Sequence, residues 1–218
     1  MSQIKERPIL FSAPMVRALL DGRKTVTRRP VKVQPHIDAS GNFCVGNSNY
    51  GQDGYGKPVT KHFVNGCCPF GKPGDRLWVR ETWAADAQVD AIAPRDLSQG
   101  EPIQYQADGA VRQTGSSMIT LGKGRPSIHM PRWVSRILLE ITDVRVERLQ
   151  DISEEQAKAE GVRLYTDHAE LGDWWHVEGI ETYSADPRKS FELLWSSVGG
   201  DWQANPWVWV VEFKPVTP

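Results

Sequence analysis

Cysteine is scarce in this sequence, with three residues among 218, and long apolar runs are absent. An odd number of cysteines, two of them adjacent at Cys67 and Cys68, does not make a disulfide framework, which agrees with a reducing compartment. No run approaches the roughly 20 apolar residues that span a bilayer, and the first residues lack the apolar core of a signal peptide. We therefore expect a soluble, cytoplasmic protein that binds no membrane.

Net charge is also nearly absent. The formal charge is -1 at pH 7, which argues against a protein that coats nucleic acid non-specifically, although a local basic patch remains possible. The sequence has no glycine-rich phosphate loop of the Walker or dinucleotide type, and no serine stands in a nucleophile elbow. These absences dismiss two common catalytic patterns.

Against this neutral background, the segment Asp21–Arg29 is densely basic. It places an amine, two hydroxyls and three guanidiniums within a few residues of Gly22. Ahead of it, Ser12 as N-cap, Pro14 in the first turn and apolar residues at helical spacing predict a helix that ends at Gly22. The segment therefore leaves the helix in a fixed direction and is a candidate site for an anionic or carbonyl-bearing ligand.

The rest of the chain alternates regular elements with two long irregular stretches. Residues 30–74 are loop-like, either a functional flap or partly disordered, and residues 84–132 form a second insertion with one strand at 103–107. Periodicity and capping signals predict the other elements, which are strands at 76–83, 135–149 and 207–213 and helices at 153–161 and 186–198. The strand at 207–213 is apolar on both faces at its start, which indicates a central position in a sheet.

Strands separated by short helices give the α+β class. A small twisted β-barrel flanked by short helices is the simplest closure, because it leaves few strand edges exposed. No internal repeat and no linker of domain-boundary character is present. We therefore expect one domain, residues 1–218, that carries the two insertions.

Four blocks of the sequence, in order, resemble the ASCH domain family. They are Gly22-x-Lys24-x-x-Thr27-x-Arg29 at a helix end, Gly74-Asp75 opening a strand, Ile152-Ser153-Glu154-Glu155 opening a helix that ends Glu160-Gly161, and the terminal Val210-Val211-Glu212-Phe213-Lys214. The stretch Cys68–Glu81 is also similar to the long ASCH proteins carried by bacterial prophages. The two insertions have no counterpart in the small members. The resemblance implies a PUA-like β-barrel and a link to RNA.

The resemblance also implies an activity. Some small bacterial members are amidohydrolases that remove the acetyl group from N(4)-acetylcytidine, and their catalytic set falls here on Lys24, Thr27 and Glu160. Thr27 would attack the carbonyl or orient a water, Lys24 would act as the base, and Glu160 would position the lysine or shuttle the proton. Arg29 would hold the oxyanion or a phosphate, with Arg28 as a peripheral member of the same anion-binding group.

The same residues allow a non-catalytic interpretation. Lys24 and Arg29 could form a phosphate grip in a module that binds RNA or a modified base. Glu160 stands near a helix C-terminus, where a carboxylate is electrostatically disfavoured, so it has either a partner, most simply Lys24, or an ordinary solvated position. RNA cleavage ranks below both interpretations because no histidine is close to the motif. The expected partner is thus a nucleoside, a modified base or RNA, and the sequence names no protein partner.

Two residues outside the motif complete the substrate-binding set. Glu81 shares a predicted strand face with apolar residues, so it points inward, where it forms a salt bridge with an arginine or serves as a reserve acid or base. Trp83 is one of nine tryptophans. Most of these are expected to pack in the core, while a few in loops could stack on a base.

Metal binding is a weaker hypothesis. Five potential ligands fall within the first irregular stretch, namely His36, Cys44, His62, Cys67 and Cys68. A single zinc ion could tie this stretch down, but an adjacent cysteine pair is not the C-x-x-C chelate of familiar zinc modules. We therefore expect no metal and no cofactor.

Overall fold

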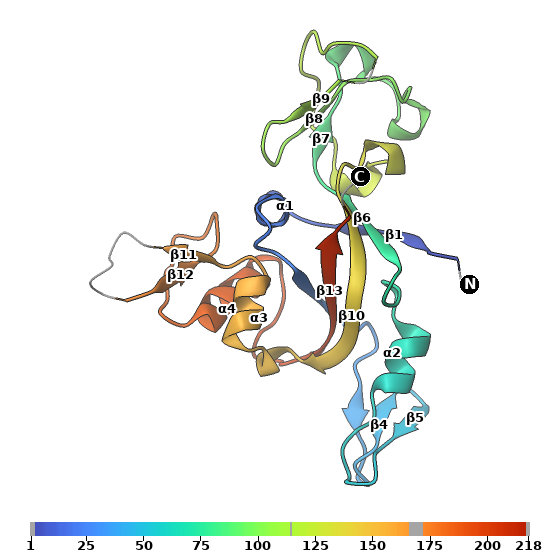
Figure 1. The fold of residues 1–218 in the computed structure, drawn as a ribbon, viewed down its shortest axis with the longest axis vertical. Helices are drawn as coiled ribbons and strands as arrows, with labels where there is room; N and C mark the ends of the chain where they lie inside the picture. The colour runs from blue at the N-terminus through green and yellow to red at the C-terminus, as the bar shows by residue number, and fades with distance from the viewer. Residues whose placement is uncertain (1–2, 114, 166–171, 217–218) are drawn as a thin grey trace. The chain divides into compact units, whose positions relative to one another are not determined.

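The computed structural model describes residues 3–113, 115–165 and 172–216, and it confirms the α+β class (Figure 1). The chain divides into two compact units: unit 1 is Met1–Gly22, Asp75–Glu140 and Pro215–Pro218, and unit 2 is Arg23–Gly74 and Ile141–Lys214. Within the described ranges, no helix is both long and apolar enough to cross a membrane. The strand pairings of these residues give no closed barrel.

Unit 1 begins with a strand that the sequence did not predict, β1 (Glu6–Leu10), which pairs in parallel with β6 (Arg76–Arg80). The other edge of β6 pairs antiparallel with the first residues of β10 (Leu138–Arg148). The predicted N-terminal helix is confirmed as α1 (Ala13–Leu20). It ends where Gly22 adopts φ 71°, a left-handed conformation that favours glycine.

The predicted strand at 76–83 is interrupted after Arg80, and its last residues belong to a different sheet. There β7 (Trp83–Ala84), β8 (Ile103–Tyr105) and β9 (Val111–Arg112) form a three-stranded antiparallel sheet. The strand predicted at 103–107 is therefore confirmed in a shorter form. Short 3-10 helices complete the irregular parts of the chain, at Ala87–Val89, Pro94–Asp96, Ser127–His129, Arg132–Val134 and Leu149–Asp151.

Buried polar side chains organise residues 84–132 where regular structure is sparse. The Asp86 carboxylate accepts hydrogen bonds from three backbone amides, and these bonds lower its pKa. Arg125 donates to two backbone carbonyls, and its guanidinium carbon lies 5.3 Å from the centre of the buried Trp83 ring. The amides belong to Gln88, Ile119 and Thr120, and the carbonyls to Val89 and Ile92.

Unit 2 is built on the later part of β10, β13 (Trp207–Pro215) and β2 (Val26–Pro30), in the order β10-β13-β2. The central position predicted for the last strand is thus confirmed. β2 was not predicted, because its short run of threonine and arginine was interpreted only as the basic exit from the helix. It pairs antiparallel with β13, so that Thr27 faces Val211 and Arg29 faces Trp209.

Two helices and a hairpin lie together in unit 2 (Figure 1). These are α3 (Glu154–Ala159), α4 (Pro187–Ser197), β11 (Arg163–Tyr165) and β12 (Trp174–His176). The predicted capping box of α3 is confirmed, since Ser153 accepts from the Gln156 amide and Gln156 accepts from the Ser153 amide. The predicted helix at 186–198 is confirmed as α4, and Val198, which caps its C-terminal end, is 58% exposed.

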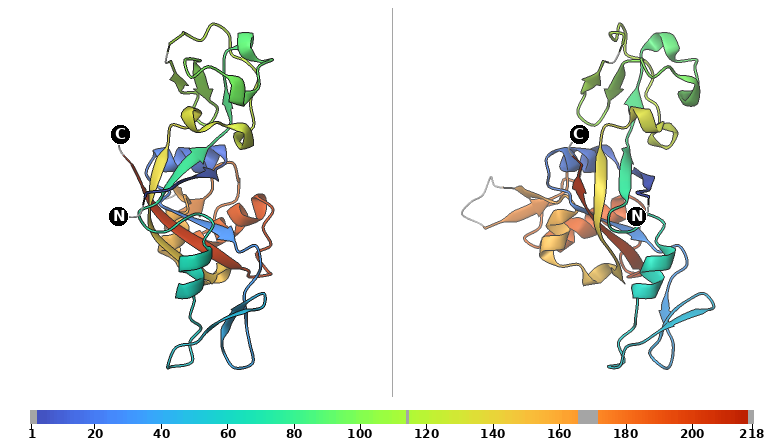
Figure 2. Two further views of the ribbon diagram at one scale, coloured as in Figure 1. Left: turned by 90° about the vertical axis from the view of Figure 1, so that its right-hand side faces the viewer. Right: turned by 45° about the vertical axis from the view of Figure 1, so that its right-hand side comes forward.

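The irregular interpretation of residues 30–74 is wrong. They form a small antiparallel sheet of β3 (His36–Ile37), β4 (Phe43–Val45) and β5 (Ser48–Gly51), followed by α2 (Lys61–Cys67), and Figure 2 shows these elements at one end of unit 2. Strands of two to four residues with a register shift after Phe43 are too short to show a period in the sequence. Aromatic contacts between Phe43, Tyr50, Phe63 and Trp207 hold them in place.

In unit 1, Glu81 forms a buried salt bridge with an arginine, which is the first of the two roles expected for it. Its carboxylate oxygens each accept a hydrogen bond of 2.9 Å from Arg136, from Nε and Nη2. Arg136 also donates to Asp108 and lies 4.0 Å from the centre of the Tyr105 ring. Burial raises the pKa of Glu81, and the arginine opposes that rise. The predicted salt bridge is therefore present.

Replacing Arg136 with glutamine should lower the free energy of unfolding by roughly 3–5 kcal/mol, because Glu81 would become a buried carboxylate without its cation. Denaturant unfolding followed by circular dichroism measures the change. Arg95→Gln is the matched control, since Arg95 and its ion-pair partner Asp96 are exposed. The double variant E81Q/R136Q should recover most of the loss. A loss below about 1 kcal/mol in R136Q, the range of exposed pairs, would contradict the prediction.

Candidate functional site

The basic segment after Gly22 caps the C-terminal end of α3. The last carbonyls of a helix have no partner within the helix, so they need donors from elsewhere. Three successive residues supply these donors. Two of them donate through cationic side chains, which are favoured at this end of a helix, and one donates through its backbone amide. The pairs are Thr25 N to Ala159 O at 2.9 Å, Lys24 Nζ to Glu160 O at 2.8 Å and Arg23 Nη1 to Gly161 O at 3.0 Å.

Lys24 and Glu160 also form a buried ion pair. Lys24 Nζ lies 2.6 Å from Glu160 Oε2, and the two side chains are 0% and 3% exposed. The partner that the sequence assigned to Glu160 is thus confirmed. Burial lowers the pKa of Lys24, the Glu160 carboxylate opposes this, and the charges of Arg29 and Arg28 lower it further. Lys24 therefore loses its proton to form the neutral amine at a lower pH than a surface lysine does.

Arg28 lies inside this cluster, where the sequence placed it at the periphery. Its Nη1 donates to Glu160 Oε1 at 3.3 Å and its Nη2 to Gln156 Oε1 at 2.7 Å, while the Glu147 carboxylate lies 3.6 Å away. The same Gln156 oxygen accepts from the Ser153 amide in the capping box. Arg28 therefore connects both ends of α3 to β2. The sequence missed this because β2 was not recognised as a strand.

Three cations surround the Glu160 carboxylate. Lys24 and Arg28 bind it directly, the charge of Glu160 also acts on Arg29, and the Glu147 carboxylate lies beside Arg28. Arg29 is half-buried; desolvation lowers its pKa, and the charge of Glu160 opposes this effect. Such a cluster favours an anionic ligand or a negative charge that develops during a reaction.

Thr27 is the member of the expected catalytic set that no hydrogen bond joins to the others. It is buried in β2, and strand alternation places it on the same face as Arg29 and on the opposite face from Arg28. Within the part of the chain that the structure describes, its hydroxyl makes no hydrogen bond. A hydroxyl without a protein partner can donate to or accept from a water or a ligand atom.

A histidine that the sequence did not connect with the motif lies near the basic segment. The pKa of His176 is lowered first by burial and then by the charge of Arg163, and the charge of Arg23 lowers it as well. Its ring packs with Tyr165 and Tyr183, at centroid distances of 5.9 Å and 5.3 Å. The stretch of aromatic residues at 174–176 was the available signal, but its contact partners are distant in sequence.

The remaining candidates lie elsewhere in the structure. Glu81 and Trp83 belong to unit 1, where Glu81 binds Arg136 and Trp83 is fully buried among apolar side chains. The three cysteines are free thiols. Among the described residues, no three histidine, cysteine, aspartate or glutamate side chains are placed to share a metal ion.

Replacing Glu160 with glutamine should lower the pKa of Lys24 further, because the carboxylate is the charge that favours the ammonium form. The variant should also lower the free energy of unfolding by roughly 3 kcal/mol or more, since two buried cations lose their counterion. Carbon-13 NMR of the lysine Cε signals during a pH titration measures the first effect. Glu155→Gln, an exposed change on the same helix, is the control. An unchanged Lys24 titration in E160Q would contradict the assignment of the pair.

Comparison with protein-family models, with curated proteins and with solved structures gave no match. The motif resemblance therefore remains an expectation, and function is argued from the cluster itself.

Proposed function

We propose that this protein hydrolyses the amide of an acylated pyrimidine nucleoside or a related small amide, with Lys24, Thr27 and Glu160 as its catalytic set. The observation that carries the proposal is the buried Lys24–Glu160 pair, in which an amine of lowered pKa is held by a carboxylate. A surface phosphate grip needs neither the burial nor the lowered pKa. Both are properties of an amine that works as a base.

The reaction assigns a role to each member. Neutral Lys24 takes a proton either from the Thr27 hydroxyl or from a water that Thr27 holds, and the resulting oxygen attacks the carbonyl carbon. The tetrahedral intermediate then breaks its C–N bond, and Lys24 returns the proton to the leaving amine. If Thr27 is acylated, a water releases the acid in a second step. Glu160 keeps Lys24 in position throughout through two acceptors, its carboxylate and its backbone carbonyl.

The charge of Arg29 supports the same chemistry. The oxyanion that forms on the carbonyl carries a negative charge, and Arg29 lies on the same strand face as Thr27. Arg28 is bound to Glu160 and Gln156, so it acts by fixing the carboxylate. The set therefore contains a base, a hydroxyl, an oxyanion donor and a positioning arginine.

The proposal includes a PUA-like fold for the part of the chain that carries the cluster. It is supported by the order of elements: a helix ends at Gly22, β2 carries Thr27, α3 ends beside Glu160, and the last strand, β13, pairs with β2. Residues 30–74 and 84–132 would be additions to that fold.

Purified protein mixed with N(4)-acetylcytidine should release acetate and cytidine, followed by absorbance. Lys24→Ala and Thr27→Val should each lower kcat by about 100-fold or more, because each removes a proton-transfer group. Lys189→Ala, an exposed lysine on α4, is the matched control. The rate should rise with pH up to the lowered pKa of Lys24, since the neutral amine is the base. Turnover that survives K24A would overturn the mechanism.

A second function, a non-catalytic module that binds RNA or a modified base, is favoured by the ring cluster of Tyr165, His176 and Tyr183. Tyr183 is exposed, the other two rings are half-buried, and Arg23 and Arg163 add positive charge nearby. Partly exposed rings beside cations are a common surface for single-stranded nucleic acid.

If this module binds RNA, Tyr183→Ala should weaken binding of a single-stranded oligonucleotide by about 5- to 100-fold, the effect of losing one stacked base. Fluorescence anisotropy at several salt concentrations measures it, and the affinity should fall steeply as salt rises. Tyr55→Ala, an exposed tyrosine in the loop after β5, is the control. Equal affinities for Y183A, Y55A and the unmodified protein would exclude this surface.

A further inference from the structure

The buried Lys24–Glu160 pair is the inner end of a longer row of alternating charges. Arg28 Nη1 donates to Glu160 Oε1 at 3.3 Å, and Arg28 Nη2 lies 3.6 Å from Glu147 Oε2. The other carboxylate oxygen of Glu147 accepts a hydrogen bond from Arg145 Nε. The row therefore runs through Lys24, Glu160, Arg28, Glu147 and Arg145, with opposite charges next to each other throughout. All five residues belong to unit 2.

The outer end of this row of charges reaches the surface. Arg145 also donates to Asp143 and to Glu212, whose side chains are 51% and 41% exposed. Glu147 is 25% exposed, whereas the side chain of Arg28 is fully buried. Asp143, Arg145 and Glu147 are alternate residues of β10, so they share one face of the strand. Glu147 is therefore the residue at which the buried and the exposed parts of the row meet.

The contact between Glu147 and Arg28 joins strands that are not neighbours. Glu147 is on β10, Arg28 is on β2, and β13 lies between these strands in the sheet. Arg145 and Glu212 already connect β10 with β13, its neighbour in the sheet. The reach of Glu147 across an intervening strand thus points to a role at Arg28 itself.

The demand on Glu160 gives the contact that role. Two buried cations, Lys24 and Arg28, lie close to the single Glu160 carboxylate. A buried cation is costly without a counterion, so these two compete for it. Glu147 supplies Arg28 with a second carboxylate, and partial burial limits the screening of this attraction by solvent. Glu160 then holds Lys24 at 2.6 Å, while its bond to Arg28 is longer, at 3.3 Å.

We propose that Glu147 is a positioning residue of the Lys24–Glu160 site. It holds Arg28, so that the Glu160 carboxylate stays on Lys24, and Arg145 holds Glu147 in place. The inference rests on the proposed function, because it concerns how the amine that acts as the base is kept in position. It adds to the site a residue of β10 that acts through Arg28.

Glu147→Gln removes the charge of this side chain and keeps its shape. Arg28 should then draw on Glu160 alone, so Lys24 loses part of the negative charge that favours its ammonium form, and its pKa should fall. The acid limb of the kcat profile for N(4)-acetylcytidine should move to lower pH as well, because the neutral amine is the base. Carbon-13 NMR of the lysine Cε signals measures the pKa, and the signal that is absent from K24R identifies Lys24.

Asp143→Asn is the matched control, since it removes the same charge from the same strand at a carboxylate that binds Arg145 and is half exposed. It should leave the Lys24 titration unchanged. Arg28→Gln tests the route, because E147Q should have no further effect on Lys24 in the R28Q background. The charge of Arg29, which also acts on Lys24, is the same in every variant.

Circular dichroism shows whether each variant is folded, and if R28Q is not, the comparison of E147Q with D143N decides. Equal Lys24 titrations in E147Q and the unmodified protein, equal shifts in E147Q and D143N, or a full E147Q shift in the R28Q background would each overturn the proposal.

The positioning role and the proposed reaction fail separately. A protein in which E147Q moves the Lys24 titration but N(4)-acetylcytidine is not hydrolysed would overturn the proposed function alone. Turnover that depends on Lys24, with a pH profile that E147Q leaves unchanged, would overturn the positioning role alone.

Discussion

The arrangement of unit 2 depends on the bonds that Lys24 and its neighbours make to the end of α3. A helix of six residues cannot hold itself together in water, so its stability comes from contacts outside it. Here Arg23, Lys24 and Thr25 satisfy its last carbonyls, and Arg28 binds its capping glutamine. The Lys24–Glu160 ion pair is the buried centre of this set. Breaking it would leave two cations without their shared counterion and would remove one of the links between α3 and the segment that leads into β2.

The same bonds have a structural and a chemical consequence. A lysine that caps a helix is usually exposed and charged, whereas Lys24 is buried and its pKa is lowered. The carboxylate and the backbone carbonyl of Glu160 fix the amine in one position, which is a requirement for a base that must meet a substrate repeatedly. Thr27, which has no hydrogen bond to the cluster, is the part of the set that a substrate or water would have to complete.

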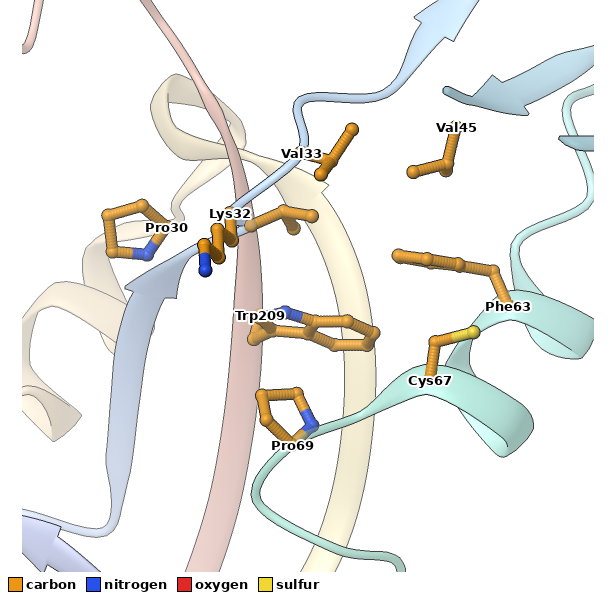
Figure 3. A pocket seen from close by; sticks show the side chains of 9 residues that line it. Pro30, Lys32, Val33, Val45, Phe63, Cys67, Pro69 and Trp209 are labelled. Atoms are coloured by element: carbon orange, nitrogen blue, oxygen red, sulfur yellow. The ribbon is translucent and has the colours of Figure 1, made fainter. Parts of the chain in front are cut away.

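Both units contain short helices and strands, and side-chain contacts hold these elements in place. Asp86 and Arg125 bind backbone groups of the segment 84–132, and stacked aromatic residues fix the sheet and helix within 30–74. A small apolar pocket lies beside Phe63 and Trp209 in this packing (Figure 3).

The sequence alone predicted the elements that carry their own local signals: α1 with Gly22, the capping box of α3, α4, and the apolar strand that became β13. It also paired Glu160 with Lys24, because a carboxylate at a helix C-terminus needs a cation. It did not predict β1, β2, β11, β12 or the sheet in 30–74, because these short runs show no clear alternation and their pairing is set by partners elsewhere in the chain. Only the tertiary structure decided that Arg28 is central, that His176 lies near Arg23 and that Phe63 stacks on Trp209. These contacts join residues that are far apart in the chain. Burial and electrostatic interactions depend on distances in space, which only the tertiary structure gives.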